Sequence, residues 1–327
     1  MLLPSLLNRS QIQDQQWDQF IQNSGQRVVY GYSWYLDLVS PGWSALVWPS
    51  AEEYQVVMPL PVVRKWGLGV IQQPFFCQYL GLFSASELEG RVTEAFLRVL
   101  SQHFRYISSY CFHPDNSPSL AKVLPACPTL LPKLLTTHWL PLNQPYITLK
   151  STYNQDRLKN LKRAEKAGWY LEELDNIAPL IDFFRNFHAS QINGGVNEAA
   201  YSLLHSLFQQ LKEKGLVRLY YAGRDGTLHA GVMLVGDEKK TVYLFNAADE
   251  TGRRLNGRTY LLDRYFQEKA GTGLVFDFES PGQVTIAEHY QSFGAQEQSF
   301  YSIRQNNLPW PLRTIQEWRL KRLTSSS

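Results

Sequence analysis

Apolar and polar residues in the C-terminal half of the chain follow two different periods. Three runs, LVRLYYAG, TLHAGVMLVG and TVYLFNAA, are rich in Val, Leu and Tyr, and short turns at residues 224–226 and 236–240 separate them. Apolar runs of this length with short polar turns between them are typical of strands. We therefore predict an antiparallel meander of three strands over residues 216–248.

A helical period follows the meander. Leu261, Leu262, Tyr265 and Phe266 recur at helical spacing, and Gly271 is expected to end that helix. LVFDFES then predicts a short strand, IAEHYQSFG a short helix, and EQSFYSIRQ a last strand. Upstream, WYLEELD alternates like a strand, and NIAPLIDFFRNFHAS and NEAAYSLLHSLFQQLKEKG predict two helices. The expected order is strand, two helices, three strands, helix, strand, helix, strand.

The N-terminal half predicts nearly the same order. Two helices, three strands, a helix, a strand, a weak helix and a strand are expected before residue 150, although no residue-level repeat is visible. A chain of 327 residues fits about two domains of ordinary size. We predict an N-terminal domain at 1–149 and a C-terminal domain at 150–327.

Composition narrows the class of protein. The 44% hydrophobic and 19% charged content is that of a globular protein, and a net charge of +3 is too small to indicate nucleic-acid binding. The three cysteines and seven histidines show no disulfide, zinc or other metal-ligand spacing. No secretory signal, membrane span, P-loop, dinucleotide fingerprint or nucleophile elbow is visible. We expect a cytoplasmic protein that binds no metal; its oligomeric state stays open.

A basic helix is expected over residues 154–167, between the two halves. The positions that can face a core are Leu158, Leu161 and Ala164. Another face carries Lys159, Arg163 and Lys166. This basic face suits an anionic acceptor or a nucleic-acid backbone, although a run of charges is commonly just a solvated helix face.

The order of elements in the C-terminal half is that of the GNAT acyltransferase fold. Two such halves joined by a basic helix resemble the FemAB family, and the motifs that carry this resemblance are KNLKRAEKAG and FDFESPGQVTIAEHYQSFGA. IQQPFFCQYLGLFS in the N-terminal half resembles the smaller, acetyltransferase-like members. The segment 175–215 has no room for the helical arm that binds tRNA in the best-known members. The resemblance implies an α+β fold of two tandem GNAT-like lobes, each a mixed, mostly antiparallel sheet flanked by helices, with acyl-CoA as co-substrate.

The resemblance places the donor after the third strand, where RRLNGRT precedes a helix. A helix N-terminus presents unpaired N–H groups that suit a pyrophosphate, and a glycine would let the backbone approach the phosphates. The candidate donor-binding residues are Asn246, Arg253, Arg254, Asn256, Gly257, Arg258 and Thr259. Backbone N–H groups near Asn246 could polarise the thioester carbonyl. A solvated, Arg-rich turn explains the same residues.

Acylation of an amine needs a base, and a carboxylate can serve. Asp277 and Glu279 end the strand that borders the cleft in GNAT folds, and Tyr290 could protonate a leaving thiolate. A surface carboxylate pair, helix caps and a core tyrosine are the alternatives. Gln73 and Tyr79 are candidate acceptor-binding residues in the N-terminal half, although burial explains them equally well. Lys159 and Arg163 are the candidates on the basic helix.

These observations predict an enzyme that moves an acetyl-type acyl group from a CoA thioester to an amine. The C-terminal lobe would hold the donor, and the N-terminal lobe would be a scaffold or bind the acceptor, a small molecule or a cell-envelope precursor. One alternative is an aminoacyl-tRNA-dependent ligase acting on a peptidoglycan precursor, which the basic helix and the tail residues Arg319, Lys321 and Arg322 favour. Another is a binding protein that kept the fold without catalysis.

Overall fold

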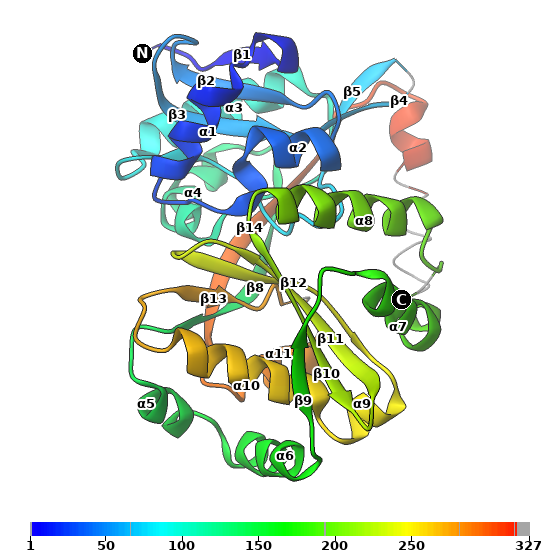
Figure 1. The fold of residues 1–327 in the computed structure, drawn as a ribbon. Coiled ribbons are helices and arrows are strands. Elements are labelled where there is room, and N and C mark those ends of the chain that lie inside the picture. Colours follow the sequence, from blue (N-terminus) through cyan, green and yellow to red (C-terminus); the bar gives the residue numbers. More distant parts are fainter. Residues whose placement is uncertain (1, 66, 193, 281, 317, 319–327) are drawn as a thin grey trace. The chain divides into compact units, whose positions relative to one another are not determined.

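The computed structural model describes residues 2–65, 67–192, 194–280, 282–316 and 318 (Figure 1). The chain forms two compact units: unit 1 contains segments 1–135 and 299–327, and unit 2 contains 136–298. This division differs from the expected one at residue 149. Residues 139–141 pair with a strand of unit 2, and the last strand pairs with one of unit 1.

Unit 1 contains two groups of paired strands. In the first, β1, β2, β3 and β6 pair in that order, all antiparallel. In the second, β4 and β5 form a hairpin, β5 pairs parallel with β7, and β7 pairs antiparallel with β14. The strands are β1 (Ser5–Asn8), β2 (Ser44–Pro49), β3 (Tyr54–Leu60), β4 (Val62–Lys65), β5 (Leu68–Gln72), β6 (Phe83–Ser84), β7 (Tyr106–Cys111) and β14 (Gln296–Asn306). The helices are α1 (Asp14–Asn23), α2 (Ser33–Val39), α3 (Gly90–His103) and α4 (Ser117–Val123).

Large aromatic side chains fill the core of unit 1. Trp17 on α1 and Trp43 are both fully buried, with ring centroids 4.9 Å apart. The element order follows the predicted one, with β1 as an additional strand and the β4–β5 hairpin inserted before β6. The N-terminal half therefore repeats the architecture without repeating the sequence.

Unit 2 is built on a mixed sheet in the order β8–β13–β12–β11–β10–β9, in which only β12 and β13 run parallel. Its strands are β8 (Leu131–Pro141), β9 (Tyr170–Glu173), β10 (Val217–Arg224), β11 (Thr227–Gly236), β12 (Lys240–Ala248) and β13 (Val275–Asp277). Its helices are α5 (Tyr146–Ser151), α6 (Gln155–Lys166), α7 (Ala178–Phe187), α8 (Glu198–Glu213), α9 (Glu250–Arg254), α10 (Gly257–Lys269) and α11 (Val284–Gln291). Figure 1 shows α10 lying along this sheet.

Successive side chains of β11 point to opposite faces of the sheet, and each face carries a helix. Ala230, Val232 and Leu234 belong to the core that contains the apolar side chains of α10. Gly231 faces α7, where a Cβ atom would lie 2.8 Å from the Tyr221 ring and 3.1 Å from Leu180. The predicted meander therefore forms the middle of a helix–sheet–helix sandwich.

Within the ranges that the structure describes, no helix combines the length and the apolar character needed to cross a bilayer. Nor do those ranges bring together three or more His, Cys, Asp or Glu side chains in a way that could hold a metal ion.

Candidate active site

Strands β12 and β13 pair for only three residues and then separate. The ladder joins Lys240, Thr241 and Val242 to Val275, Phe276 and Asp277, and β12 continues to Ala248. The β11–β12 register shifts so that Leu244 is an extra residue in β12. A bulge of this kind bends a strand and re-aims its side chains, and bulges often lie beside active sites. The separation of two parallel strands therefore marks the candidate site.

The segment after β12 is more ordered than the predicted turn. Asp249 caps the short helix α9 by accepting a hydrogen bond from Gly252 N at 2.7 Å, and Asn256 at φ +59° reverses the chain before α10. Gly257 is buried, and a Cβ atom there would lie 3.1 Å from Ala230 Cβ and 3.4 Å from Gly252 O. The close approach of α10 to the sheet is thus sufficient reason for this glycine.

The first turn of α10 carries two of the predicted donor residues into contact with other elements. Arg258 Nη1 donates to Asn246 Oδ1 on β12 at 2.6 Å. Thr259 is buried, and its hydroxyl accepts a hydrogen bond from Arg157 on α6. Arg253 and Arg254, in contrast, are exposed on α9. The predicted donor residues therefore divide into an inner set and an outer pair.

Arg157 is the central polar side chain of this region, and only 3% of its surface is exposed. Its Nε donates to Ser292 Oγ at 2.9 Å, and its Nη1 donates to Thr259 Oγ1 at 2.6 Å. Its Nη2 donates to Nδ1 of His289 at 2.8 Å and to the carbonyl oxygen of the same residue at 3.3 Å. The guanidinium carbon lies 4.1 Å from the centroid of the Phe293 ring. Arg157 thus ties α6 to α10 and α11.

The charge of Arg157 has no carboxylate partner among the described residues, and the same is true of Arg258. Burial lowers the pKa of Arg157 to about 10, so the side chain remains a cation at neutral pH. Two arginines whose hydrogen-bond partners among the described residues are neutral create a positive potential at the N-terminus of α10, which adds its own partial positive charge. This arrangement favours an anionic ligand.

His289 is held in one neutral form by its neighbours. Burial and the charges of Arg157 and Arg258 lower its pKa to about 3. Arginine can only donate hydrogen bonds, so Nδ1 of His289 must accept, and the single proton of the neutral ring must lie on Nε2. His289 therefore offers a fixed N–H donor.

Aromatic rings line the space where β12 and β13 separate. Tyr290 on α11 stacks on Phe278 with ring centroids 4.5 Å apart, and its edge meets Tyr243 at 6.2 Å. Neither tyrosine hydroxyl forms a hydrogen bond with another described residue. Burial raises the pKa of Tyr290 to about 12, and Arg258 and Glu279 both lie close enough to affect that pKa. Tyr290 is therefore protonated at neutral pH and able to donate.

The two candidate carboxylates occupy different environments. Asp277 is fully buried, accepts hydrogen bonds from Thr137 Oγ1 at 2.9 Å and Glu279 N at 3.0 Å, and lies 3.5 Å from Lys240 Nζ. Glu279 is half-buried, and its backbone has the uncommon φ of +49°. The contacts of Asp277 are those of a group that fixes the end of β13, whereas Glu279 is accessible.

The remaining candidates are divided between the units. Gln73 in unit 1 donates to Cys77 O at 2.8 Å and accepts from Cys111 N at 3.0 Å, and Tyr79 is fully buried among aromatic rings. Both side chains thus have a structural role within unit 1. Lys159 and Arg163 are exposed on α6, as the helical pattern predicts.

The sequence pattern of α6 contained a signal for Arg157. The helix buries positions 157, 161 and 164, so an arginine occupies the face that also carries Leu161 and Ala164. The prediction that Leu158 faces the core is also confirmed, because its half-buried side chain packs against the core of unit 2. His289 differs from Arg157 in this respect. Its partner Arg157 lies 132 residues away, so the local sequence could not show the contact.

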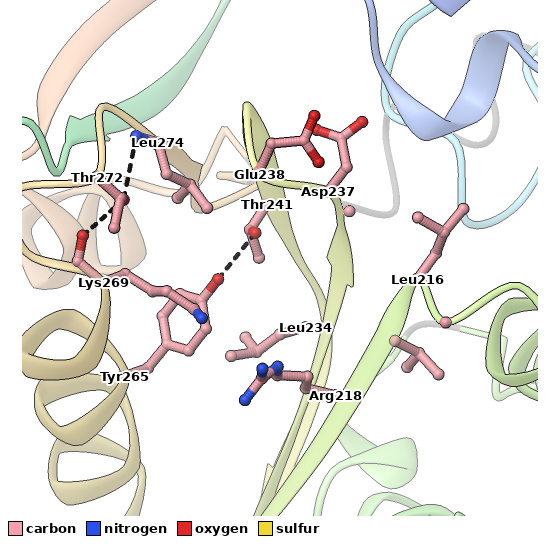
Figure 2. Close-up of a pocket in the computed structure, with 13 residues that line it drawn as sticks. Leu216, Arg218, Leu234, Asp237, Glu238, Thr241, Tyr265, Lys269, Thr272 and Leu274 are labelled. Carbon is pink, nitrogen blue, oxygen red and sulfur yellow. Dashed lines mark hydrogen bonds between the residues drawn. The ribbon is translucent and has the colours of Figure 1, made fainter.

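A cavity of about 400 Å³ lies elsewhere in unit 2, between the C-terminal end of α10 and the sheet. Figure 2 shows Tyr265 bonded to Thr241 in this cavity, with the cationic groups of Arg218 and Lys269 nearby. It lies near the first residues of β12, whereas Asn246 is near the other end of that strand. None of the predicted site residues lines it.

Comparison with known proteins agrees with this architecture. Residues 154–292 match the family model of an acetyltransferase (GNAT) domain. This segment runs from the N-cap of α6 to the end of α11 and contains both arginines. It is therefore a GNAT-type domain, as the sequence resemblance predicted. No curated protein matches the chain in sequence.

Solved structures extend the likeness to the whole chain. FemX is 13% identical with a TM-score of 0.64, over 93% of this chain and 98% of that one. A tandem GNAT protein from the clavulanic acid biosynthesis pathway is 11% identical with a TM-score of 0.52, over 94% and 99%. L-PGS from Bacillus licheniformis is 9% identical with a TM-score of 0.52, over 97% and 98%. At these identities the likeness establishes the fold alone, and it confirms the predicted architecture of two tandem GNAT-like lobes.

Proposed function

We propose that the protein is an N-acyltransferase that moves an acetyl-type acyl group from a CoA thioester to an amine. The observation that carries the proposal is the separation of β12 from β13 beside Arg258, which lacks a carboxylate partner among the described residues. An anionic donor would supply the missing negative charge. The GNAT match over residues 154–292 supports the same reaction class.

The donor would lie with its phosphates at the N-terminus of α10. Unpaired N–H groups of the first turn and the guanidinium of Arg258 suit oxyanions. Asn246 holds Arg258 in place at 2.6 Å, and Asn256 sets the direction from which α10 begins. The exposed Arg253 and Arg254 would contribute a weaker, solvent-screened attraction.

The reacting thioester would lie between the ends of β12 and β13. Backbone N–H groups of β12 near Asn246 would hydrogen-bond the carbonyl oxygen as negative charge develops on it, and one such donor is typically worth about 10²–10³-fold in rate. Glu279 would accept the proton of the attacking amine. Tyr290, whose pKa of about 12 keeps its hydroxyl protonated, would donate to the leaving thiolate. Asp277 would act as a positioning residue for Glu279 through the backbone N–H that it accepts.

Thiol release from acetyl-CoA in the presence of a panel of amines tests this proposal. Glu279→Gln and Tyr290→Phe are expected to lower kcat by about 10²–10⁴-fold for an accepted amine. If the wild type released no thiol with any amine, or if both variants kept full activity, the assignment of these roles would be wrong.

An aminoacyl-tRNA donor is the second candidate, and the exposed face of Lys159, Arg163 and Lys166 favours it. Phosphate contacts release counterions, so tRNA binding would weaken steeply with salt. Detectable binding at low salt that Lys159→Gln with Arg163→Gln abolishes would favour this donor. No binding at low salt would exclude it.

A further inference from the structure

A second cavity in unit 2, of about 460 Å³, lies between the start of α6 and α11. Its volume falls within the ~300–1,000 Å³ usual for small-molecule sites. Every described residue that lines it has a polar side chain. The lining residues are Asn154, Asp156, Arg157, Asn160, Thr285, Glu288, His289, Gln291 and Ser292. A ligand of this cavity must therefore be polar.

Two lining side chains, Arg157 and His289, are hydrogen-bond donors, and Arg157 carries a positive charge. Arg157 has five N–H groups, and its four hydrogen bonds leave one N–H of Nη1 unused. His289 adds an Nε2–H, because Nδ1 accepts from Arg157, and within the described residues this N–H has no acceptor. Two donors and a cation without a carboxylate partner suit a carboxylate or another oxyanion.

The outer groups of the same cavity have the opposite charge. Asp156 precedes Arg157 on α6, and Glu288 precedes His289 on α11; both are exposed, Asp156 with 83% of its side chain accessible. Asp156 lies 3.4 Å from Lys159, in an exposed pair that contributes little. Each helix thus supplies a donor, buried for Arg157 and half-buried for His289, and, one residue earlier, an exposed carboxylate.

This order of charges discriminates between ligand classes. A phosphate would reach the donors only past two carboxylates, and a simple amine would meet Arg157 at the floor. We propose that the cavity binds a small zwitterion of the amino-acid class, with its carboxylate on Arg157 and His289 and its ammonium group at Asp156 and Glu288. Asn160 and Thr285 would contact the rest of the ligand. This site goes beyond the proposed acyl transfer, because binding requires no reaction.

Calorimetric and ligand-detected NMR titrations with the twenty amino acids test the proposal. Acetate and ethylamine, which carry one charge each, and inorganic phosphate are titrated beside them. At least one amino acid is expected to bind at least about tenfold more tightly than acetate or ethylamine. The proposal is overturned if none binds at about 10 mM, or if acetate, ethylamine or phosphate binds as tightly as the best amino acid.

Variants of the exposed carboxylates test the orientation without disturbing the core. Asp156→Asn with Glu288→Gln is expected to weaken amino-acid binding by about threefold to tenfold. Glu165→Gln, on α6 but outside the cavity, should leave binding unchanged. Arg157→Gln should abolish binding, and circular dichroism must show that this variant folds. An unchanged affinity in the carboxylate double variant would contradict the proposal, whatever Arg157→Gln does.

Discussion

The end of β13 and the start of α6 both bury a charged side chain, and they do so in opposite ways. Asp277 is fully buried and lies 3.5 Å from the cation of Lys240, with Thr137 and the N–H of Glu279 also bonded to its carboxylate. Arg157 is 3% exposed, and its hydrogen-bond partners among the described residues are all neutral. One charge is balanced within unit 2, whereas the other is balanced by no described carboxylate.

This difference separates a structural ion from one available to a ligand. Removing one partner of a buried pair leaves the other charge uncompensated, so the pair is required for stability once it is in place. Arg157 has no carboxylate partner among the described residues, and the burial of its charge lowers its pKa. The buried guanidinium of Arg157 is therefore already in position to bind an anion.

Asp277→Asn should have the largest effect on stability. It removes the charge that balances Lys240, which is itself only 10% exposed, and we expect the free energy of unfolding to fall by about 3 kcal/mol. Urea denaturation measures this loss. Glu279→Gln, two residues away and half-buried, is the control and should cost less than about 1 kcal/mol. Equal losses in the two variants would contradict the structural role of Asp277.

Arg157→Met should destabilise less, by about 1–2 kcal/mol. The variant loses four hydrogen bonds to neutral groups but also relieves the burial of an unbalanced charge. Arg163→Met, on the exposed face of the same helix, is the control for the substitution itself. A loss as large as that of Asp277→Asn would show that Arg157 is as structural as Asp277, and the contrast would fail.

The neutral state of His289 predicts a pH dependence of stability. Its pKa is about 3 when folded and near 6.5 when unfolded, so the unfolded state binds the proton first as pH falls. The stabilisation from the neutral ring is complete above pH 6.5 and is lost toward pH 3, by up to about 1.4 kcal/mol per pH unit.

His289→Asn, which keeps an acceptor for Arg157, should reduce this slope between pH 6.5 and 4. His138 and His188, whose pKa values burial also lowers, remain in both proteins and cancel in the comparison. Identical slopes for the wild type and His289→Asn would show that His289 does not titrate as predicted.

Substitutions on the exposed face of α6 should have the smallest effect. Lys159→Gln and Arg163→Gln are expected to change the free energy of unfolding by less than about 0.5 kcal/mol, because both side chains are exposed. Thermal denaturation checks this expectation. A larger loss from Arg163→Gln would indicate a contact that the basic face makes only in solution.

The sequence predicts the fold better than the site, and α6 and β12 show why. Alternating and helical patterns predict the meander over 216–248 and the helix after it, because the spacing of apolar residues along the chain is enough to indicate these elements. The contact of Arg258 with Asn246 spans 12 residues and follows from the predicted order of elements. The contacts of Arg157 with Thr259 and His289 span 102 and 132 residues and depend on how three helices pack.

Gly257 lies between these two cases, because its local structure could be predicted from the sequence but its packing against β11 could not. The sequence predicts a turn at Gly257 that leads into a helix, and α10 begins at this residue, but the reason offered for the glycine was access for phosphates. The structure shows a second reason for a glycine, because a Cβ atom at this position would lie 3.1 Å from Ala230 Cβ on β11. Substituting Gly257 would therefore disturb helix–sheet packing, and a loss of binding in such a variant would say little about the donor. Arg258 is the better residue to change.

Calorimetric titration with acetyl-CoA tests whether Arg258 and the N-terminus of α10 bind an acyl-CoA donor. Three proteins are compared: the wild type, Arg258→Gln, and Arg264→Gln, an exposed position on the same helix. The account predicts binding to the wild type and to Arg264→Gln, and binding weakened by about tenfold or more in Arg258→Gln. Absence of binding to the wild type, or equal affinity in Arg258→Gln, would contradict it.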